Sequence, residues 1–165
     1  MNLTIERLTD EHLPAFYAVA KAEEPFAAEM APTLNHFRAM LAGAGGLEGF
    51  VLLADGEVVG GVTFTDHVPL VDVMIHAVVS KRIRGRWLSR KVLGTVFAFC
   101  FEELALPRVS AYALPGVMPE AEWLLLKMGF HVEGVKACAT LRPDGYHDVM
   151  LFGMLRSQCP WLTVA

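Results

Sequence analysis

Cysteine is scarce in this 165-residue sequence, and its placement excludes two classes of small protein. The three cysteines, Cys100, Cys138 and Cys159, are odd in number, lie far apart and form no Cys-x-x-Cys pair. This pattern argues against a disulfide framework and against a zinc site, so we expect reduced thiols in the core. The six histidines also lack the His-x-x-x-His and His-Glu-x-x-His spacings of metal sites. We therefore predict no metal.

Long apolar runs are missing as well. A bilayer span takes about 20 apolar residues, whereas the run 92–101 lies between Lys91 and Glu102. We expect no transmembrane helix. Charged Glu6 and Arg7 stand where a secretory signal would need its apolar segment, which favours a cytoplasmic protein.

The net charge of the sequence is small. Fourteen basic and eighteen acidic residues give a formal net charge of −4, which argues against a broad nucleic-acid-binding surface. With 54% hydrophobic and 19% charged residues, the composition is far from that of disordered chains. The length predicts one domain, residues 1–165, with a full hydrophobic core.

Hydrophobic periodicity and turn residues predict a mixed α/β order, β-α-α-β-β-β-α-β-α-β-β. Asp55-Gly56 between two apolar runs predicts a hairpin. Pro119 and Gly129 are typical of the start and end of a helix. The expected strands are 3–8, 50–54, 58–64, 70–79, 109–113 and two around 143–145, and the expected helices follow Thr9 and span 34–41, 86–104 and 119–128.

Basic residues are concentrated at one place. Six of the fourteen lie close together: Lys81, Arg82, Arg84, Arg86, Arg90 and Lys91. They join the end of an apolar strand to the start of the most apolar helix, where backbone N–H groups and the helix dipole favour anions. This placement predicts a phosphate-binding loop. The alternative is a strand-to-helix loop that is merely polar.

The segment 79–89, VSKRIRGRWLS, resembles the pyrophosphate loop of the GNAT superfamily of acyl-CoA-dependent N-acyltransferases, whose pattern is Arg/Gln-x-x-Gly-x-Gly/Ala. Arg84 matches the first position of the pattern and Gly85 matches the glycine that commonly follows it, whereas Trp87 replaces the first glycine of the pattern and Ser89 its last residue. Because backbone N–H groups make most of the phosphate contacts, Trp87 is compatible with binding if it packs away from the ligand. The alternative is that Trp87 blocks the loop.

The resemblance extends over nearly the whole chain. LLLKMGF at 124–130, followed by Glu133 and Gly134, is similar to the segment after the last helix of the family, and FGMLRSQCPWL at 152–162 resembles members carried by phages and prophages. Leu125 and Met118 stand where the family often has a catalytic tyrosine and an asparagine. The resemblance implies the GNAT fold, a twisted mixed sheet of about seven strands with about four helices and two splayed strands at the acyl-CoA site.

The resemblance also implies where acetyl-CoA binds. Pantetheine would enter between strands 70–79 and 109–113, and an unpaired strand N–H would polarise the thioester carbonyl. The implied contacts are Ala77, Val78 and Val79 of the strand and Arg84, Gly85, Arg86, Trp87, Leu88, Ser89 and Arg90 of the loop.

Candidate catalytic residues lie on the same two strands. Period-two alternation places Asp72 and His76 on one face, and either side chain is a candidate base for the amine; apolar Val71 and Val73 would bury Asp72 and raise its pKa. Tyr112 is the candidate acid for the coenzyme thiolate. The alternatives are a solvated aspartate, a hydrogen-bonded histidine and a core tyrosine.

The resemblance implies direct transfer of an acetyl group to a primary amine, from a small molecule or a protein. Acidic residues between the first two helices, among them Glu23, Glu24 and Glu29, would attract a protonated amine, unless they form a solvated loop. A CoA-binding module with little activity, and a nucleic-acid contact with strong salt dependence, are the other hypotheses. The mean hydropathy of +0.41 favours a homodimer.

Overall fold

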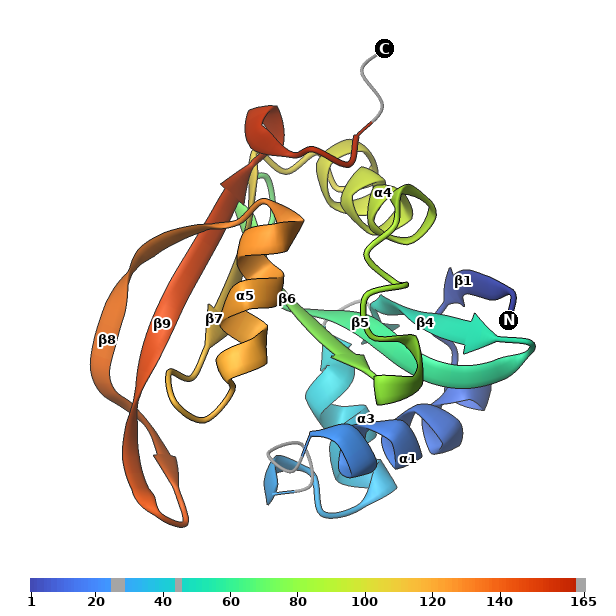
Figure 1. The fold of residues 1–165 in the computed structure, drawn as a ribbon, viewed down its shortest axis with the longest axis horizontal. Coiled ribbons are helices and arrows are strands. Elements are labelled where there is room, and N and C mark those ends of the chain that lie inside the picture. The colour runs from blue at the N-terminus through green and yellow to red at the C-terminus, as the bar shows by residue number, and fades with distance from the viewer. Residues whose placement is uncertain (25–28, 44–45, 163–165) are drawn as a thin grey trace. The chain divides into compact units, whose positions relative to one another are not determined.

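A computed structural model describes residues 1–24, 29–43 and 46–162. Seven strands of the described chain form one mixed sheet (Figure 1): β1 (Leu3–Arg7), β4 (Gly49–Ala54), β5 (Glu57–Val68), β6 (Asp72–Val79), β7 (Arg108–Ala113), β8 (His131–Arg142) and β9 (Gly145–Leu155). Their order is β1-β4-β5-β6-β7-β9-β8, and β2 (Ala42–Gly43) pairs separately with β3 (Gly46–Leu47). The described helices of eight or more residues are α1 (Leu13–Glu23), α3 (Leu34–Leu41), α4 (Arg90–Ala98) and α5 (Pro119–Met128).

This arrangement confirms the expected mixed α/β class with seven strands in the main sheet and four helices among the described residues. The chain divides into two compact units. The first contains residues 1–67 and 75–96, and the second contains residues 68–74 and those from 97 onward.

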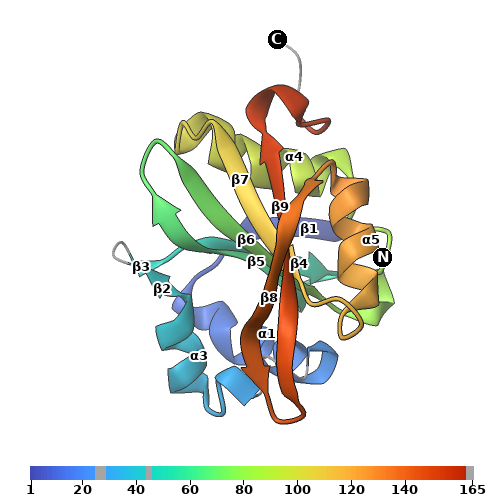
Figure 2. The same ribbon diagram turned by 90° about the vertical axis from the view of Figure 1, so that its left-hand side faces the viewer.

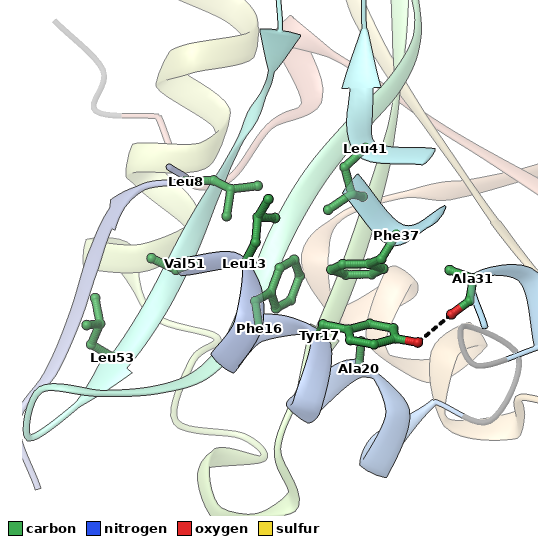
Figure 3. Close-up of a cluster of buried hydrophobic side chains, with 10 residues drawn as sticks. All are labelled: Leu8, Leu13, Phe16, Tyr17, Ala20, Ala31, Phe37, Leu41, Val51 and Leu53. Atoms are coloured by element: carbon green, nitrogen blue, oxygen red, sulfur yellow. Dashed lines mark hydrogen bonds between the residues drawn. The ribbon is translucent and has the colours of Figure 1, made fainter. Parts of the chain in front are cut away.

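In the first unit, α1 and α3 pack against β4 through a cluster of buried apolar side chains (Figures 1 and 3). The aromatic rings of Tyr17 and Phe37 lie 5.1 Å apart between their centroids. The Tyr17 hydroxyl donates a hydrogen bond of 2.7 Å to the Ala31 carbonyl, so its one polar atom is satisfied inside the cluster. Leu13, Phe16 and Tyr17 are therefore on the buried face of α1, the helix predicted to follow Thr9.

The β4–β5 hairpin turns at the predicted dipeptide. Asp55 and Gly56 have φ values of 51° and 88°, the left-handed conformations that a two-residue hairpin turn with the right-handed strand twist requires. Ala54 pairs with Glu57 across the turn.

Gly60 lets β5 approach β6 closely. A Cβ at this position would lie 2.6 Å from the Val78 carbonyl oxygen and 2.9 Å from the Val79 Cα. Neither backbone atom can rotate away as a side chain would. Residues 78 and 79 are therefore held by direct backbone packing from β5.

We expect Gly60→Ala to destabilise the protein by about 1–3 kcal/mol, because overpacking here displaces backbone. Urea unfolding followed by circular dichroism measures the change. An unaltered urea midpoint would show that β5 and β6 can separate at no cost.

In the second unit, β8 and β9 form a long antiparallel hairpin whose β9 strand pairs with β7 (Figure 2). Met74 of β6 is in parallel register with Ser110 of β7. The predicted helix Pro119–Met128 is confirmed, and it ends at Gly129 with a left-handed φ of 100°.

Several predicted boundaries are wrong; the strand predicted to end at residue 64, for example, continues to Val68. The helix expected from residue 86 begins at Arg90, because the Ser89 hydroxyl accepts the Val92 N–H at 3.3 Å and so caps α4. A π-helical turn, Phe99–Glu103, replaces the expected α-helical end. The strand expected from residue 70 begins at Asp72, because Leu70 is in a turn with a φ of 61° and is 72% exposed.

The three cysteines are free thiols, but only Cys100 is buried. Cys138 is exposed, so its expected place in the core is wrong. It has a left-handed φ of 50° where the β8–β9 register shifts, and its N–H donates to the Asp148 carboxylate at 2.9 Å. Among the described helices, none has the length and hydropathy needed to cross a membrane.

Candidate functional site

The basic loop between β6 and α4 is anchored by two buried apolar side chains. Ser80 begins it by accepting the Arg82 N–H through its hydroxyl at 3.3 Å. Ile83 is fully buried and Trp87 is 1% exposed, so the side chain of Trp87 is packed inside the protein, as the first of the two interpretations of this residue requires. Its indole Nε1–H is buried and has no hydrogen-bond partner among the described residues.

Three backbone N–H groups of this loop have no acceptor within the described chain: those of Gly85, Trp87 and Leu88. Their neighbours are satisfied, since the Arg86 N–H donates to the Ile83 carbonyl at 2.9 Å and the Ser89 N–H donates to the Trp87 carbonyl at 2.8 Å. Gly85 has a φ of 80° and open space around it. The loop thus presents main-chain donors directly before the positive end of α4.

Positive charge surrounds these donors. Arg86 and Arg90 are exposed, and the guanidinium group of neither residue makes a hydrogen bond or an ion pair with another described residue. Arg82 instead pairs with Glu57 at 3.2 Å, and the Lys91 ammonium donates to the Leu3 carbonyl at 3.0 Å. The predicted basic cluster therefore contains both structural cations and cations available to an anion.

The β6 segment before the loop keeps part of its surface accessible. Ala77 is exposed, whereas Val78 and Val79 are half-buried. The next residue, Ser80, donates its N–H to the Val59 carbonyl at 2.8 Å, which ties the end of β6 to β5.

His76 lies in a polar contact that the sequence did not reveal. Its Nε2 is 2.8 Å from the Thr65 hydroxyl of β5, and that hydroxyl donates to the Asp66 carboxylate at 3.2 Å. Burial lowers the pKa of His76, and the negative charge of Asp66 opposes part of this effect. The sequence indicated this contact only through the polar residues that directly follow the apolar run 58–64.

Asp72 has an ionic environment rather than an apolar one. Its carboxylate lies 3.2 Å from the Arg108 Nε and accepts a short hydrogen bond from Ser110. Arg108 also donates to Glu133 at 2.7 Å, and these contacts, with Glu133 the strongest, raise the pKa of Arg108. Val73 is fully buried but Val71 is 50% exposed, and because the contacts of Asp72 are polar, the expected apolar surroundings of Asp72 are wrong.

The remaining predicted residues are spread over other elements. Tyr112 is half-buried on β7, opposite Leu151 of β9. Met118 is the residue before α5, and Leu125 lies within that helix. Glu23, at the end of α1, accepts the Lys81 N–H at 3.2 Å, so one acid proposed for the amine instead holds the start of the loop. The described residues contain no group of three or more metal-ligand side chains.

Comparison with known proteins finds no matching family model and no matching curated sequence. Solved structures do match. One is a spermidine N-acetyltransferase chimera of SpeG from Vibrio cholerae and hSSAT, 18% identical, with a TM-score of 0.73 over 95% of this chain and 98% of that one. Another is a GNAT-family acetyltransferase from Bacillus anthracis, 16% identical, with a TM-score of 0.71 over 95% of this chain and 96% of that one. The chain therefore has the fold of the GNAT acetyltransferases.

Proposed function

We propose that this protein is an N-acetyltransferase that moves the acetyl group of acetyl-CoA directly to a primary amine. The main observation behind the proposal is the loop after β6. The N–H groups of Gly85, Trp87 and Leu88 make no hydrogen bond to another described residue. Arg86 and Arg90 lie in the same loop region and add positive charge. Main-chain donors before a helix suit a pyrophosphate. The fold shared with acetyltransferases supports the same function.

In the proposed complex, the β6 backbone at Ala77, Val78 and Val79 binds the pantetheine arm, and residues 84–90 bind the pyrophosphate. A strand N–H polarises the thioester carbonyl as negative charge develops on its oxygen. The amine nitrogen attacks the carbonyl carbon and gives its proton to His76, directly or through water. The C–S bond then breaks, and Tyr112 protonates the leaving thiolate. Asp72 is the second candidate for the base.

A primary amine is the proposed acceptor class because the spermidine N-acetyltransferase named above has the same fold. Residues 152–162 are the grounds for a further proposal, that the protein is of the type carried by phages and prophages. We propose a cytoplasmic enzyme that forms a homodimer.

Leu125 favours a second candidate function. It occupies the α5 position where the resemblance places a tyrosine acid, and an aliphatic side chain cannot donate a proton. A CoA-binding protein of low catalytic power would keep the loop donors without that acid. Tight coenzyme binding with no thiol release, across a panel of amines, would select this function.

We expect acetyl-CoA to raise the melting temperature by roughly 5 to 10 °C at a hundredfold excess over Kd, because binding to the native state alone adds about 2.7 kcal/mol. Differential scanning fluorimetry measures the shift, and thiol release with amines then measures transfer. An unchanged melting temperature with millimolar CoA or acetyl-CoA would contradict the proposed function.

Variants of the loop test where the coenzyme binds. Gly85→Pro removes an N–H donor at a φ of 80° that proline cannot adopt, whereas Arg84→Ala removes charge alone. Both should weaken acetyl-CoA binding, the proline variant more. The double variant Arg86→Gln/Arg90→Gln keeps the loop backbone and should also weaken binding. Equal affinity in all three would place the coenzyme elsewhere.

A further inference from the structure

Asp66 lies near the end of strand β5 and has an irregular backbone conformation. This residue has a φ of 51°, a left-handed conformation that aspartate adopts more readily than most residues but that still carries strain. In a regular strand, neighbouring side chains point to opposite faces of the sheet. The turn at Asp66 breaks this alternation and brings its carboxylate to the hydroxyl of the preceding residue, Thr65, at 3.2 Å.

The same hydroxyl contacts His76, so the direction of one hydrogen bond determines the direction of the other. A threonine hydroxyl has one proton to donate and two lone pairs that accept. When Thr65 donates that proton to the Asp66 carboxylate, which can only accept, the 2.8 Å contact with His76 is made by the imidazole donating its Nε2–H to Thr65. In the neutral ring, Nδ1 then carries the lone pair.

We propose that Asp66 is a positioning residue that acts through Thr65 to hold neutral His76 in its Nε2–H form, with Nδ1 as the atom that accepts the amine proton. The inference rests on the proposed function for its catalytic meaning. When the proton arrives at Nδ1, the imidazolium keeps its Nε2–H bond to Thr65. The positive charge then has the Asp66 carboxylate close to it, which stabilises the charged state.

The charged groups near His76 agree with this role. Asp66 raises the pKa of the imidazole against the larger, opposite effect of burial. His67, the residue after Asp66, has Nδ1 4.0 Å from the Glu48 carboxylate. On β6 itself, the carboxylate of Asp72 is engaged by Arg108 and Ser110.

The test is an NMR titration of His76, assigned by loss of its signals in His76→Gln. Long-range proton–nitrogen spectra report the tautomer, and the titration reports the pKa. We expect the Nε2–H form in the native protein. Asp66→Asn keeps a residue that tolerates a left-handed φ but removes the charge, so it should lower the pKa of His76. An Nδ1–H tautomer, or an unchanged pKa in Asp66→Asn, would overturn the proposal.

Steady-state kinetics of two matched variants at Thr65 provide a second test. Thr65→Val removes the hydroxyl at nearly constant shape and should lower kcat/KM by roughly tenfold or more, whereas Thr65→Ser keeps the hydroxyl and should restore most of it. Asp66→Asn should cost about two- to fivefold, because its exposed charge is screened by solvent, and should shift the acid limb to lower pH. The KM for acetyl-CoA should stay unchanged throughout.

The two assays distinguish failure of the proposed hydrogen-bonded series Asp66–Thr65–His76 from failure of the proposed function. If the native protein transfers no acetyl group but shows the expected tautomer and titration, the proposed function is wrong and the hydrogen-bonded series is supported. If transfer occurs and Thr65→Ser is as impaired as Thr65→Val, the positioning role is wrong.

Discussion

Replacing His76 with glutamine is expected to lower kcat/KM by about 10²- to 10⁴-fold, the usual contribution of a general base. Glutamine can still donate to the Thr65 hydroxyl, which His76 contacts at 2.8 Å, so the strand contact should survive while proton acceptance is lost. Steady-state thiol release with a confirmed acceptor amine measures the effect. The Kd for acetyl-CoA should not change.

The pH dependence has a definite direction. Burial lowers the pKa of His76, so kcat/KM should rise with pH through an apparent pKa below the ordinary histidine value of about 6.5. The unfolded chain also takes up this proton at higher pH than the folded chain does. The stability contributed by the neutral ring is therefore complete above about pH 6.5 and is lost as the pH falls through the folded-state pKa. His76→Gln should remove both dependences, which urea unfolding and rate profiles from pH 5 to 8 measure.

Asp72→Asn is the matched comparison. Asp72 lies on the same strand, but its carboxylate is already engaged by Arg108 at 3.2 Å and by the Ser110 hydroxyl, so it is not free to contact the amine. Its replacement should cost far less activity than that of His76. A loss below tenfold in both variants would remove both from the mechanism, and the amine would then have to arrive already deprotonated.

Trp87→Ala should destabilise the protein by about 3–5 kcal/mol, the usual cost of deleting a buried aromatic ring. The side chain is 1% exposed and anchors the loop together with Ile83. Its removal should also weaken acetyl-CoA binding, because the N–H groups of residues 85, 87 and 88 would lose their fixed positions. Urea unfolding and calorimetry measure the two effects.

Trp87→Phe is the control, since it keeps an aromatic ring and removes the indole N–H. That N–H is buried without a partner among the described residues, so its loss should cost little, below about 1.5 kcal/mol for a conservative apolar exchange. If the phenylalanine variant loses as much acetyl-CoA affinity as the alanine variant, the positions of the loop N–H groups depend on the full indole ring and not on an aromatic ring alone.

Elements decided by local chemistry could be predicted from the sequence. Asp55-Gly56 predicted its hairpin because two adjacent residues supply the left-handed turn. Gly129 predicted the end of α5 for a similar reason. The start of α4 was predicted too early because apolar residues at helical spacing extend back to Leu88. The hydroxyl of Ser89, which caps the helix, decides where it begins.

The candidate site could be predicted only in part, because its contacts join different strands. The concentration of basic residues located the loop, and alternation placed His76 on a polar face of β6. Its partners Thr65 and Asp66 were missed because a left-handed φ at Asp66 is a property of the folded backbone. Arg108 was missed as the partner of Asp72 because the two residues lie on different strands, β7 and β6.

The loop after β6 has a consequence for how the sequences of such proteins can diverge. Its donors are main-chain atoms, and its shape depends on the buried side chains of Ile83 and Trp87 and on one left-handed glycine, Gly85. Substitutions at other loop positions, proline excepted, leave the donors in place as long as those three residues and the hydroxyls of Ser80 and Ser89 remain. The coenzyme site proposed for this loop could therefore keep its geometry while most of its residue pattern changes.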